Sequence, residues 1–202
     1  MKLKRPIHYS ANITAGSLLV RESRKVAELL LLGLNRQEIK QKLLEENLFQ
    51  VRAQSSTVRR FRLVMDRLQS LDKTILPLIM GDENILATQS VLACSVKHSR
   101  LLGDFMLKVI GRKIRIIDDK LSDRDWEKYL ESCEELDPHA EKFTVSTRKK
   151  LRQIVFRILA ESRFIESQLD RRLVFLRIEP ELKTFLVNQD EKYVLKCLEV
   201  CE

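Results

Sequence analysis

The stretch TVRRFRLVMDRLQSL, residues 57–71, divides into an apolar side and a basic side when it is wound as a helix. At about 100° per residue, one arc collects the apolar side chains and the opposed arc collects the arginines. The apolar arc holds Val58, Phe61, Val64, Met65, Leu68 and Leu71, and the basic arc holds Arg59, Arg60, Arg62 and Arg67. Because a planar guanidinium pairs bidentately with phosphate or guanine, the stretch predicts a helix that packs on one side and contacts DNA on the other. The alternative interpretation is a solvated surface helix.

The sequence before this helix is typical of a helix-turn-helix. Asn35 and Glu38, three residues apart, form a capping-box pattern that starts a short helix ending near Glu45. The polar turn Gln50–Ser56 then leads into the arginine-rich helix. Since the second helix of such a motif meets DNA, residues 35–71 are predicted to be a basic, DNA-contacting segment.

Composition favours a fold built mainly of helices. The 202 residues include only 5 Gly and 4 Pro, whereas the helix-favouring residues Leu, Lys, Arg and Glu are abundant. Glycine this scarce argues against the phosphate-cradling loops of Rossmann-type and P-loop enzymes. We therefore predict an all-α fold, with an N-terminal helical domain over residues 1–136.

A second, smaller lobe is predicted over residues 137–202, because the Asp-Pro pair at its start breaks the helical pattern. Within it, Phe164–Ile165 and Leu173–Ile178 have the apolar character of two short strands joined by a polar loop. We expect this lobe to be winged-helix-like, with a short β-wing, or purely helical.

Charge is distributed in blocks along the chain, whose net charge is +8. Residues 1–80 carry 15 Lys and Arg against 7 Asp and Glu, and residues 146–178 carry 9 against 3. Between them, residues 121–145 carry 3 against 8. Two basic blocks separated by an acidic one suggest a polyanionic partner. We interpret the acidic segment around Asp118–Glu135 as a hinge or a partner surface rather than a metal site.

The second basic block repeats the pattern of the first, with a basic helix followed by a basic loop. Its predicted DNA-contacting residues are Arg148, Lys149, Lys150 and Arg152 on the helix and Arg171 and Arg172 beside the wing. If both blocks share one surface, they engage about four to seven phosphates, and log affinity then falls with log salt with a slope of about −4 to −6. Positive charge spread over both lobes favours phosphate contacts over reading of the base sequence.

Signals of enzymatic chemistry are weak. The three histidines are dispersed, and none has a metal-ligand partner at helical or turn spacing. Cys197 and Cys201 share a helix face but have no nearby His, which makes a zinc site a poor interpretation. Lys97-His98-Ser99-Arg100 could perform acid–base chemistry but lacks a neighbouring carboxylate to orient it. We expect no catalytic residues, no metal, no cofactor and no small-molecule substrate.

No feature of the sequence suggests a membrane protein. The longest apolar stretch, Leu29–Leu34, is far below the roughly 20 residues that a membrane-spanning helix needs. The basic residues at the N-terminus are not followed by the apolar run of a signal peptide. A cytoplasmic protein with reduced thiols is therefore expected.

Several strings of residues resemble the BrxA family. They are Tyr9–Thr14, Glu22–Arg24, Ala27–Gly33, Glu45–Leu48 and Lys97–Phe105, and the resemblance covers residues 9–110 well and residues 140–180 loosely. This family is the small, non-enzymatic component of BREX bacteriophage-defence systems and is described as similar to the helical antitermination protein NusB. The resemblance implies a helical fold, a bacterial cytoplasmic setting, larger BREX subunits as partners and nucleic-acid binding. It defines no catalytic residues.

The sequence therefore favours a non-enzymatic, largely sequence-independent double-stranded DNA-binding component of a BREX system. One alternative is an assembly adaptor whose basic faces dock on acidic proteins. A second alternative is NusB-like RNA binding, which the small number of aromatic residues disfavours, because single strands are commonly bound by stacking.

Overall fold

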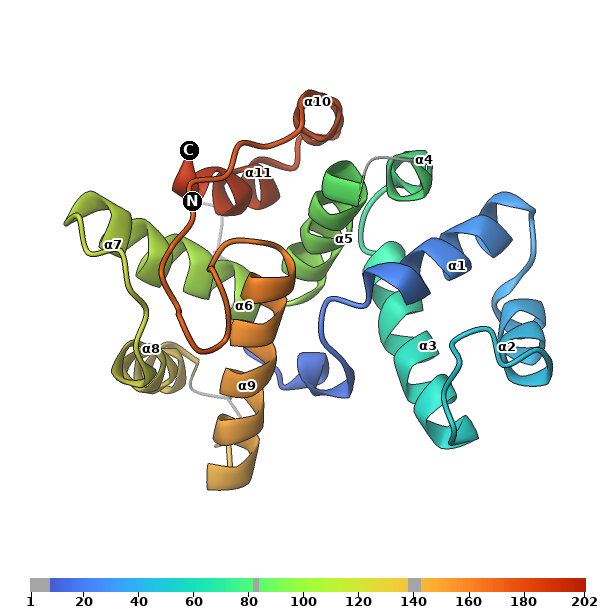
Figure 1. Cartoon of the computed structure of the whole chain (residues 1–202), viewed down its shortest axis with the longest axis horizontal. Helices are drawn as coiled ribbons and strands as arrows, with labels where there is room; N and C mark the ends of the chain where they lie inside the picture. The colour runs from blue at the N-terminus through green and yellow to red at the C-terminus, as the bar shows by residue number, and fades with distance from the viewer. Residues whose placement is uncertain (1–7, 82–83, 138–142) are drawn as a thin grey trace, which may run out of the picture.

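The computed structural model describes residues 8–81, 84–137 and 143–202, which form helices joined by loops (Figure 1). No strand or sheet occurs in these ranges, so the predicted all-α fold class is confirmed. The elements are η1 (Asn12–Ala15), α1 (Val20–Leu31), α2 (Arg36–Glu45), α3 (Gln54–Leu68), η2 (Lys73–Ile75), α4 (Leu76–Met80), α5 (Asn84–His98), α6 (Arg100–Phe105), η3 (Met106–Ile110), α7 (Gly111–Arg115), α8 (Asp123–Leu136), α9 (Val145–Glu161), α10 (Pro180–Asn188), α11 (Lys192–Leu198) and η4 (Glu199–Cys201). None of the helices in the described ranges has the length and apolarity that crossing a membrane requires.

The centre of the fold is α5. Almost every residue from Leu86 to Val96 is buried, as expected for a helix that is covered on all sides. It contacts α1, α3 and α4 on one side and α6, α10 and α11 on the other. In Figure 1 the helices α1–α4 accordingly lie to one side of α5, and α6–α9 lie to the other.

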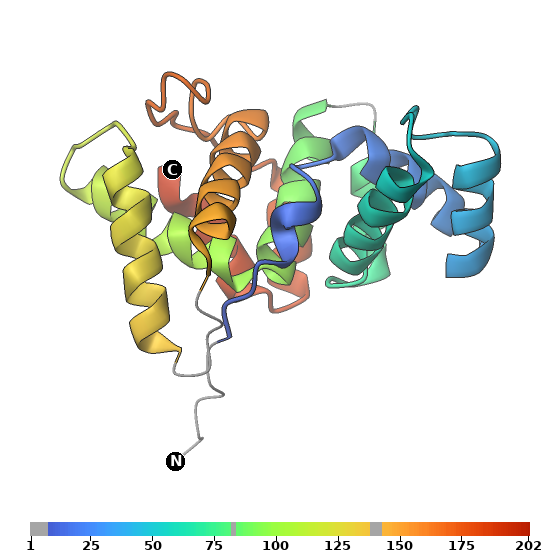
Figure 2. The ribbon, with the colours of Figure 1, turned by 90° about the horizontal axis from the view of Figure 1, so that it is seen from below.

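The segment that precedes α1 links these two groups of helices. Its side chains Tyr9, Ile13 and Leu18 are buried, and η1 packs against both α3 and α9. Both views place η1 between α3 and α9, with α8 on the far side of α9 (Figures 1 and 2). The two helices predicted to bind DNA are therefore neighbours of one short segment.

Local sequence signals explain how several helices begin and end. The capping box predicted at the start of α2 is confirmed, because the Asn35 side chain accepts from the backbone N–H of Glu38, and the Glu38 carboxylate accepts from that of Asn35. At the end of α1, Gly33 adopts a left-handed conformation with φ of 85°. The N–H groups of Gly33 and Leu34 then bond back to the carbonyls of Leu30 and Leu29, which closes the helix.

Of the two expected forms of the C-terminal lobe, the one with a β-wing is not formed, because the described residues contain no strand. Between α9 and α10 the chain forms only two isolated bridges, Lys120 with Arg172 and Ile165 with Leu173. The apolar residues that suggested strands, including Phe164 and Ile165, are buried in the core instead. This loop bonds within itself, where the Glu166 N–H donates to the Arg172 carbonyl, and to the α7–α8 connection, where the Leu173 N–H donates to the Asp119 carbonyl at 2.6 Å.

Candidate nucleic-acid interface

The arginines of α3 occupy different environments. Arg59 and Arg62 are exposed and make no ion pair within the described part of the chain. Arg60 is half-buried, and its Nη1 lies 2.8 Å from Glu22 Oε1 at the start of α1. On the side that faces α2, Arg36 pairs with Asp66 at 3.0 Å. The freely exposed basic surface of α3 therefore consists of Arg59 and Arg62.

Arg67 is buried, and the prediction that it lies on the exposed face is wrong. Its side chain is 1% exposed, and Nη1 donates to the carbonyls of Ser17 at 2.7 Å and Leu18 at 3.2 Å. Burial lowers the pKa of Arg67 to about 10, which still leaves it charged at neutral pH. Leu63 lies between Arg59 and Arg67 around the helix and is also buried. An apolar residue at this position is the sequence signal that this side of the helix is covered.

The connection between α2 and α3 differs from that of a helix-turn-helix. It spans Glu46–Ala53, eight residues, whereas the motif uses a turn of about three or four. Two of its residues, Asn47 and Gln50, have φ of 46° and 52°. The two helices do pack on each other, but the short turn that orients a recognition helix is missing.

Most arginines of the second basic block are paired within the chain. Arg148 Nη2 donates to the Glu134 carboxylate at 2.6 Å, and Arg152 Nη1 lies 2.8 Å from Asp123 Oδ2. Arg171 pairs with Asp123 and stacks on the ring of Phe156. These three side chains hold α9 and the loop after it against α8, which reduces the charge that they offer to a ligand.

The remaining residues of this block are available to solvent. Lys149 and Lys150 are exposed and form no ion pair in the described residues. Arg172 is exposed and lies 3.7 Å from the exposed Asp119, a separation at which the pair is weak.

On the side that faces α9, the acidic segment is a packed helix rather than a free surface. Its residues Asp123–Leu136 form α8, whose Trp126, Tyr129 and Leu130 are buried. Trp126 and Tyr129 pack against Phe105, with ring centroids 5.2 and 5.3 Å apart. The acidic edge of α8 therefore pairs with Arg148 and Arg152 of α9, and charge counts along the sequence do not reveal this pairing between segments.

A hollow lies where α1, α3 and α9 approach each other. Its volume is about 470 Å³, and Arg21, Arg60 and Arg157 line it from the three helices together with Glu22 and Glu161. The exposed cations of α3 and α9 thus belong to two helices that border one concave surface. We call Arg59, Arg62, Lys149 and Lys150 the open basic set.

The residues considered for catalysis have structural roles. Lys97 pairs with Glu191 at 2.7 Å, and the Ser99 hydroxyl caps α6 by accepting from the Leu102 N–H. All four cysteines are buried, and burial raises the pKa of Cys94 and Cys197 to about 12, which makes both poor nucleophiles. In the described ranges, no group of three or more His, Cys, Asp or Glu residues is arranged to hold a metal ion.

The sequence was compared with models of known protein families. The BrxA family model matches residues 7–190, which is most of the chain. The chain belongs to the BrxA family.

Three curated relatives carry the name "BREX protein BrxA". The one from Paramagnetospirillum magneticum is 34% identical over 95% of this chain and 96% of its own length. The relative from Escherichia coli is 25% identical over 93% of this chain and 88% of its own length. The relative from Bacillus cereus is 30% identical over 81% of this chain and 82% of its own length. A crystal structure of an uncharacterized protein from Magnetospirillum magneticum has a TM-score of 0.88 at 34% identity, covering 95% of this chain and 98% of that one.

The strings by which the chain resembles BrxA proteins build a buried polar network around Asp104. Its carboxylate accepts from the hydroxyls of Tyr9 at 2.7 Å and Tyr193 at 2.9 Å. Arg100 Nε lies 2.9 Å and Lys108 Nζ lies 3.2 Å from the same carboxylate. The network joins the N-terminal segment, α6, η3 and α11, so these BrxA residues stabilise the fold in this chain.

Gly103, within the same string, allows α6 and α11 to approach closely. A Cβ at this position would lie 2.3 Å from the Tyr193 hydroxyl oxygen. The Cys197 thiol also donates to the Gly103 carbonyl at 3.4 Å. This BrxA string therefore provides a helix cap at Ser99 and a close helix crossing at Gly103.

Proposed function

We propose that this BrxA-family chain is a non-catalytic component of a BREX system that binds double-stranded DNA through its phosphates. The observation that carries the proposal is the open basic set, because these four side chains are exposed and unpaired within the described residues and lie on two helices that flank η1. Lysine and arginine so placed gain affinity by releasing counterions from the duplex. Other BREX subunits are the expected protein partners, in keeping with the names of the relatives.

Duplex DNA fits the surface better than single-stranded RNA or DNA. Proteins that bind single strands stack bases on exposed aromatic rings. Among the described residues of this chain, Phe175 is the one aromatic side chain that is largely exposed, at 73%. A single ring does not make a stacking platform.

An assembly role is the second candidate, and it is favoured by apolar side chains on the surface. Ile117 and Leu169 are 94% and 96% exposed, and Phe175 adds a third large apolar group. Exposed apolar groups of this size are typical of protein–protein contacts when they gather in one patch. This role is compatible with DNA binding because none of these residues belongs to the open basic set.

Charge reversal on α3 tests the proposal. In the Arg59→Glu, Arg62→Glu variant we expect duplex affinity at about 0.1 M salt to fall about 60-fold, because each phosphate contact contributes about eightfold there. The slope of log affinity against log salt should become shallower by about 2. Fluorescence anisotropy with a labelled duplex measures both quantities.

The matched control is Arg177→Glu, Lys196→Glu, which changes the net charge equally. Both residues are exposed, and they lie just before α10 and within α11, on the side of the molecule away from the start of α3 (Figure 1). We expect the control to retain most of the affinity. Equal losses in the two variants would mean that α3 has no particular role, and undiminished affinity in the α3 variant would refute its assignment.

A further inference from the structure

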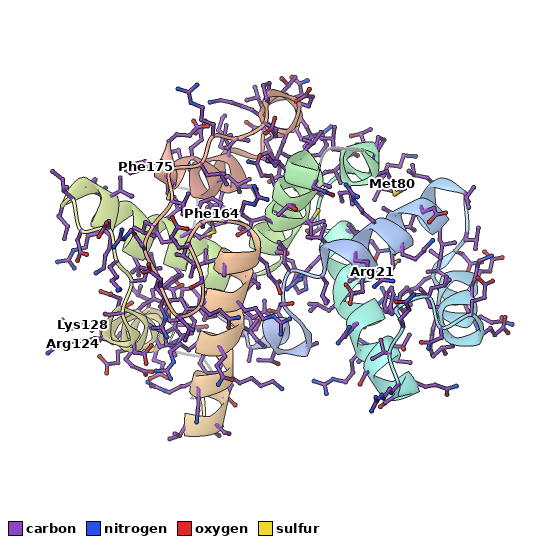
Figure 3. All side chains as sticks on the ribbon, viewed as in Figure 1. Arg21, Met80, Arg124, Lys128, Phe164 and Phe175 are labelled. Carbon is purple, nitrogen blue, oxygen red and sulfur yellow. The ribbon has the colours of Figure 1, made fainter. Side chains whose placement is uncertain are left out.

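A second hollow lies between the η3–α7 segment and α8, distant in sequence from the residues discussed for DNA. Its volume is about 420 Å³. Lys108, Arg112 and Lys113 line one wall, and Lys128 lines the other from α8. Figure 3 labels Lys128 beside Arg124 at the outer edge of α8. Four cations thus surround one concave surface.

Two of these cations, Lys113 and Lys108, form ion pairs with carboxylates of the chain. Lys113 is 12% exposed and pairs with Asp118 at 2.7 Å and Asp125 at 3.1 Å, so its charge is neutralised in the wall. Lys108 lies 3.2 Å from Asp104, but that carboxylate is shared with Arg100, and the Lys108 side chain remains 42% exposed. Lys108 therefore retains part of its charge for the hollow.

The other two cations are uncompensated. Arg112 and Lys128 are exposed and make no ion pair with any residue in the described ranges. Four cations and two carboxylates, Asp118 and Asp125, line the hollow, which leaves an excess of two positive charges before the pairing of Lys108 with Asp104 is counted. A concave surface with an excess of one sign of charge attracts ligands of the other sign.

The rest of the hollow is partly apolar. Val109, Ile116 and the Tyr129 ring contribute to its walls, and the Tyr129 hydroxyl is fixed by donating to the Leu101 carbonyl at 2.7 Å. Lys108 and Val109 lie on a turn of π-helix, in which the Gly111 N–H bonds to the Met106 carbonyl. Such turns are rare and frequently occur at functional sites. The volume lies within the range of about 300–1,000 Å³ that is usual for small-ligand pockets.

We propose that this hollow binds a phosphate-bearing small molecule of the nucleotide class, as a ligand rather than a substrate. Lys108, Arg112 and Lys128 contact the phosphates, because ammonium and guanidinium groups form strong, charge-assisted hydrogen bonds with phosphate oxygens. Val109 and Ile116 contact the organic part. Sequence analysis missed the hollow because Lys128 lies in the acidic block, and its basic neighbours become apparent only when α7 packs beside it.

Calorimetric titration of the full chain tests the proposal with ATP, inorganic pyrophosphate and adenosine. We expect ATP and pyrophosphate to bind, and adenosine to bind at least about tenfold more weakly than ATP, because it lacks the phosphates. In the Arg112→Gln, Lys128→Gln variant we expect ATP affinity to fall about tenfold or more. The control Arg115→Gln, Arg124→Gln removes two exposed charges from the same helices outside the hollow and should leave ATP affinity within about twofold.

Several outcomes would overturn the proposal. These are absence of heat with about 1 mM ATP and pyrophosphate, equal affinity for adenosine and ATP, or equal losses in the pocket and control variants. A fourth outcome combines two results: a short duplex displaces ATP, and the Arg112→Gln, Lys128→Gln variant loses duplex affinity. Together these results would mean that the hollow binds the DNA backbone. If the same variant loses ATP binding but keeps its duplex affinity, the result supports binding of a small ligand in the hollow. The proposed DNA interface on α3 and α9 is then tested separately.

Discussion

Replacing Asp104 with alanine is expected to lower the free energy of unfolding by about 2–4 kcal/mol, because it leaves the buried Tyr9 hydroxyl and the partly buried Tyr193 hydroxyl without their acceptor. The hydroxyls of Tyr9 and Tyr193 lose their hydrogen bonds, and Arg100 and Lys108 lose the carboxylate between them. Urea denaturation of both proteins measures the difference. The control Asp66→Ala removes an exposed pair with Arg36 and should cost less than about 1 kcal/mol. A similar small loss for Asp104→Ala would contradict the central role of this network.

The pH dependence of stability provides a check on the same network. Burial alone raises the pKa of Asp104, but hydrogen bonds from Tyr9 and Tyr193 and the nearby cations outweigh it, so the pKa lies below its ordinary value. The stabilisation by this carboxylate is therefore present at neutral pH and is lost as the pH falls below about 4. Burial, reinforced by Asp104, raises the pKa of Tyr9, so the phenol should destabilise the fold as the pH rises above about 10.

Replacing Arg67 with alanine is expected to cost about 2–4 kcal/mol of stability, through a cavity and two carbonyls left without a donor. Those carbonyls, of Ser17 and Leu18, precede α1, where Leu19 has φ of 60°. Arg67→Met should cost less, because it fills the volume and removes a buried charge. Thermal and urea unfolding measure these differences.

Duplex affinity separates a structural role of Arg67 from a binding role. We expect either Arg67 variant, under conditions where it is folded, to bind the duplex within about twofold of the parent, because no phosphate contact is removed. A stable Arg67→Ala protein that had lost duplex binding would overturn the structural assignment.

The elements that could be predicted from sequence are those determined by neighbouring residues. The capping box at Asn35 depends on side chains three positions apart, and the apolar stripe through Phe61 and Val64 depends on one helix alone. Such local patterns fix where helices form and which side of each is buried. They led correctly to an all-α fold.

The features that sequence analysis missed depend on contacts between distant segments. The periodicity of α3 groups Arg67 with the exposed arginines, and the apolar Leu63 between Arg59 and Arg67 is the one sequence signal that η1 and α1 cover this side of the helix. Arg148 and Arg152 were counted as free charges, although α8 supplies their carboxylate partners. The expected wing is reduced to two isolated bridges, of which one joins Ile165 to Leu173 and the other joins Arg172 to Lys120 of the α7–α8 connection. Blocks of charge along a chain therefore overstate the charge available at its surface.

The salt dependence of duplex binding tests the proposed function most directly. The open basic set offers about four phosphate contacts, so log affinity should fall with log salt with a slope of about −4, at the shallow end of the range expected from sequence. Between about 50 and 200 mM salt, affinity should fall about 150-fold, and duplexes of unrelated sequence should behave alike. A slope near −1, absence of duplex binding at about 50 mM salt, or strong preference for one sequence would contradict phosphate-dominated DNA binding by this chain.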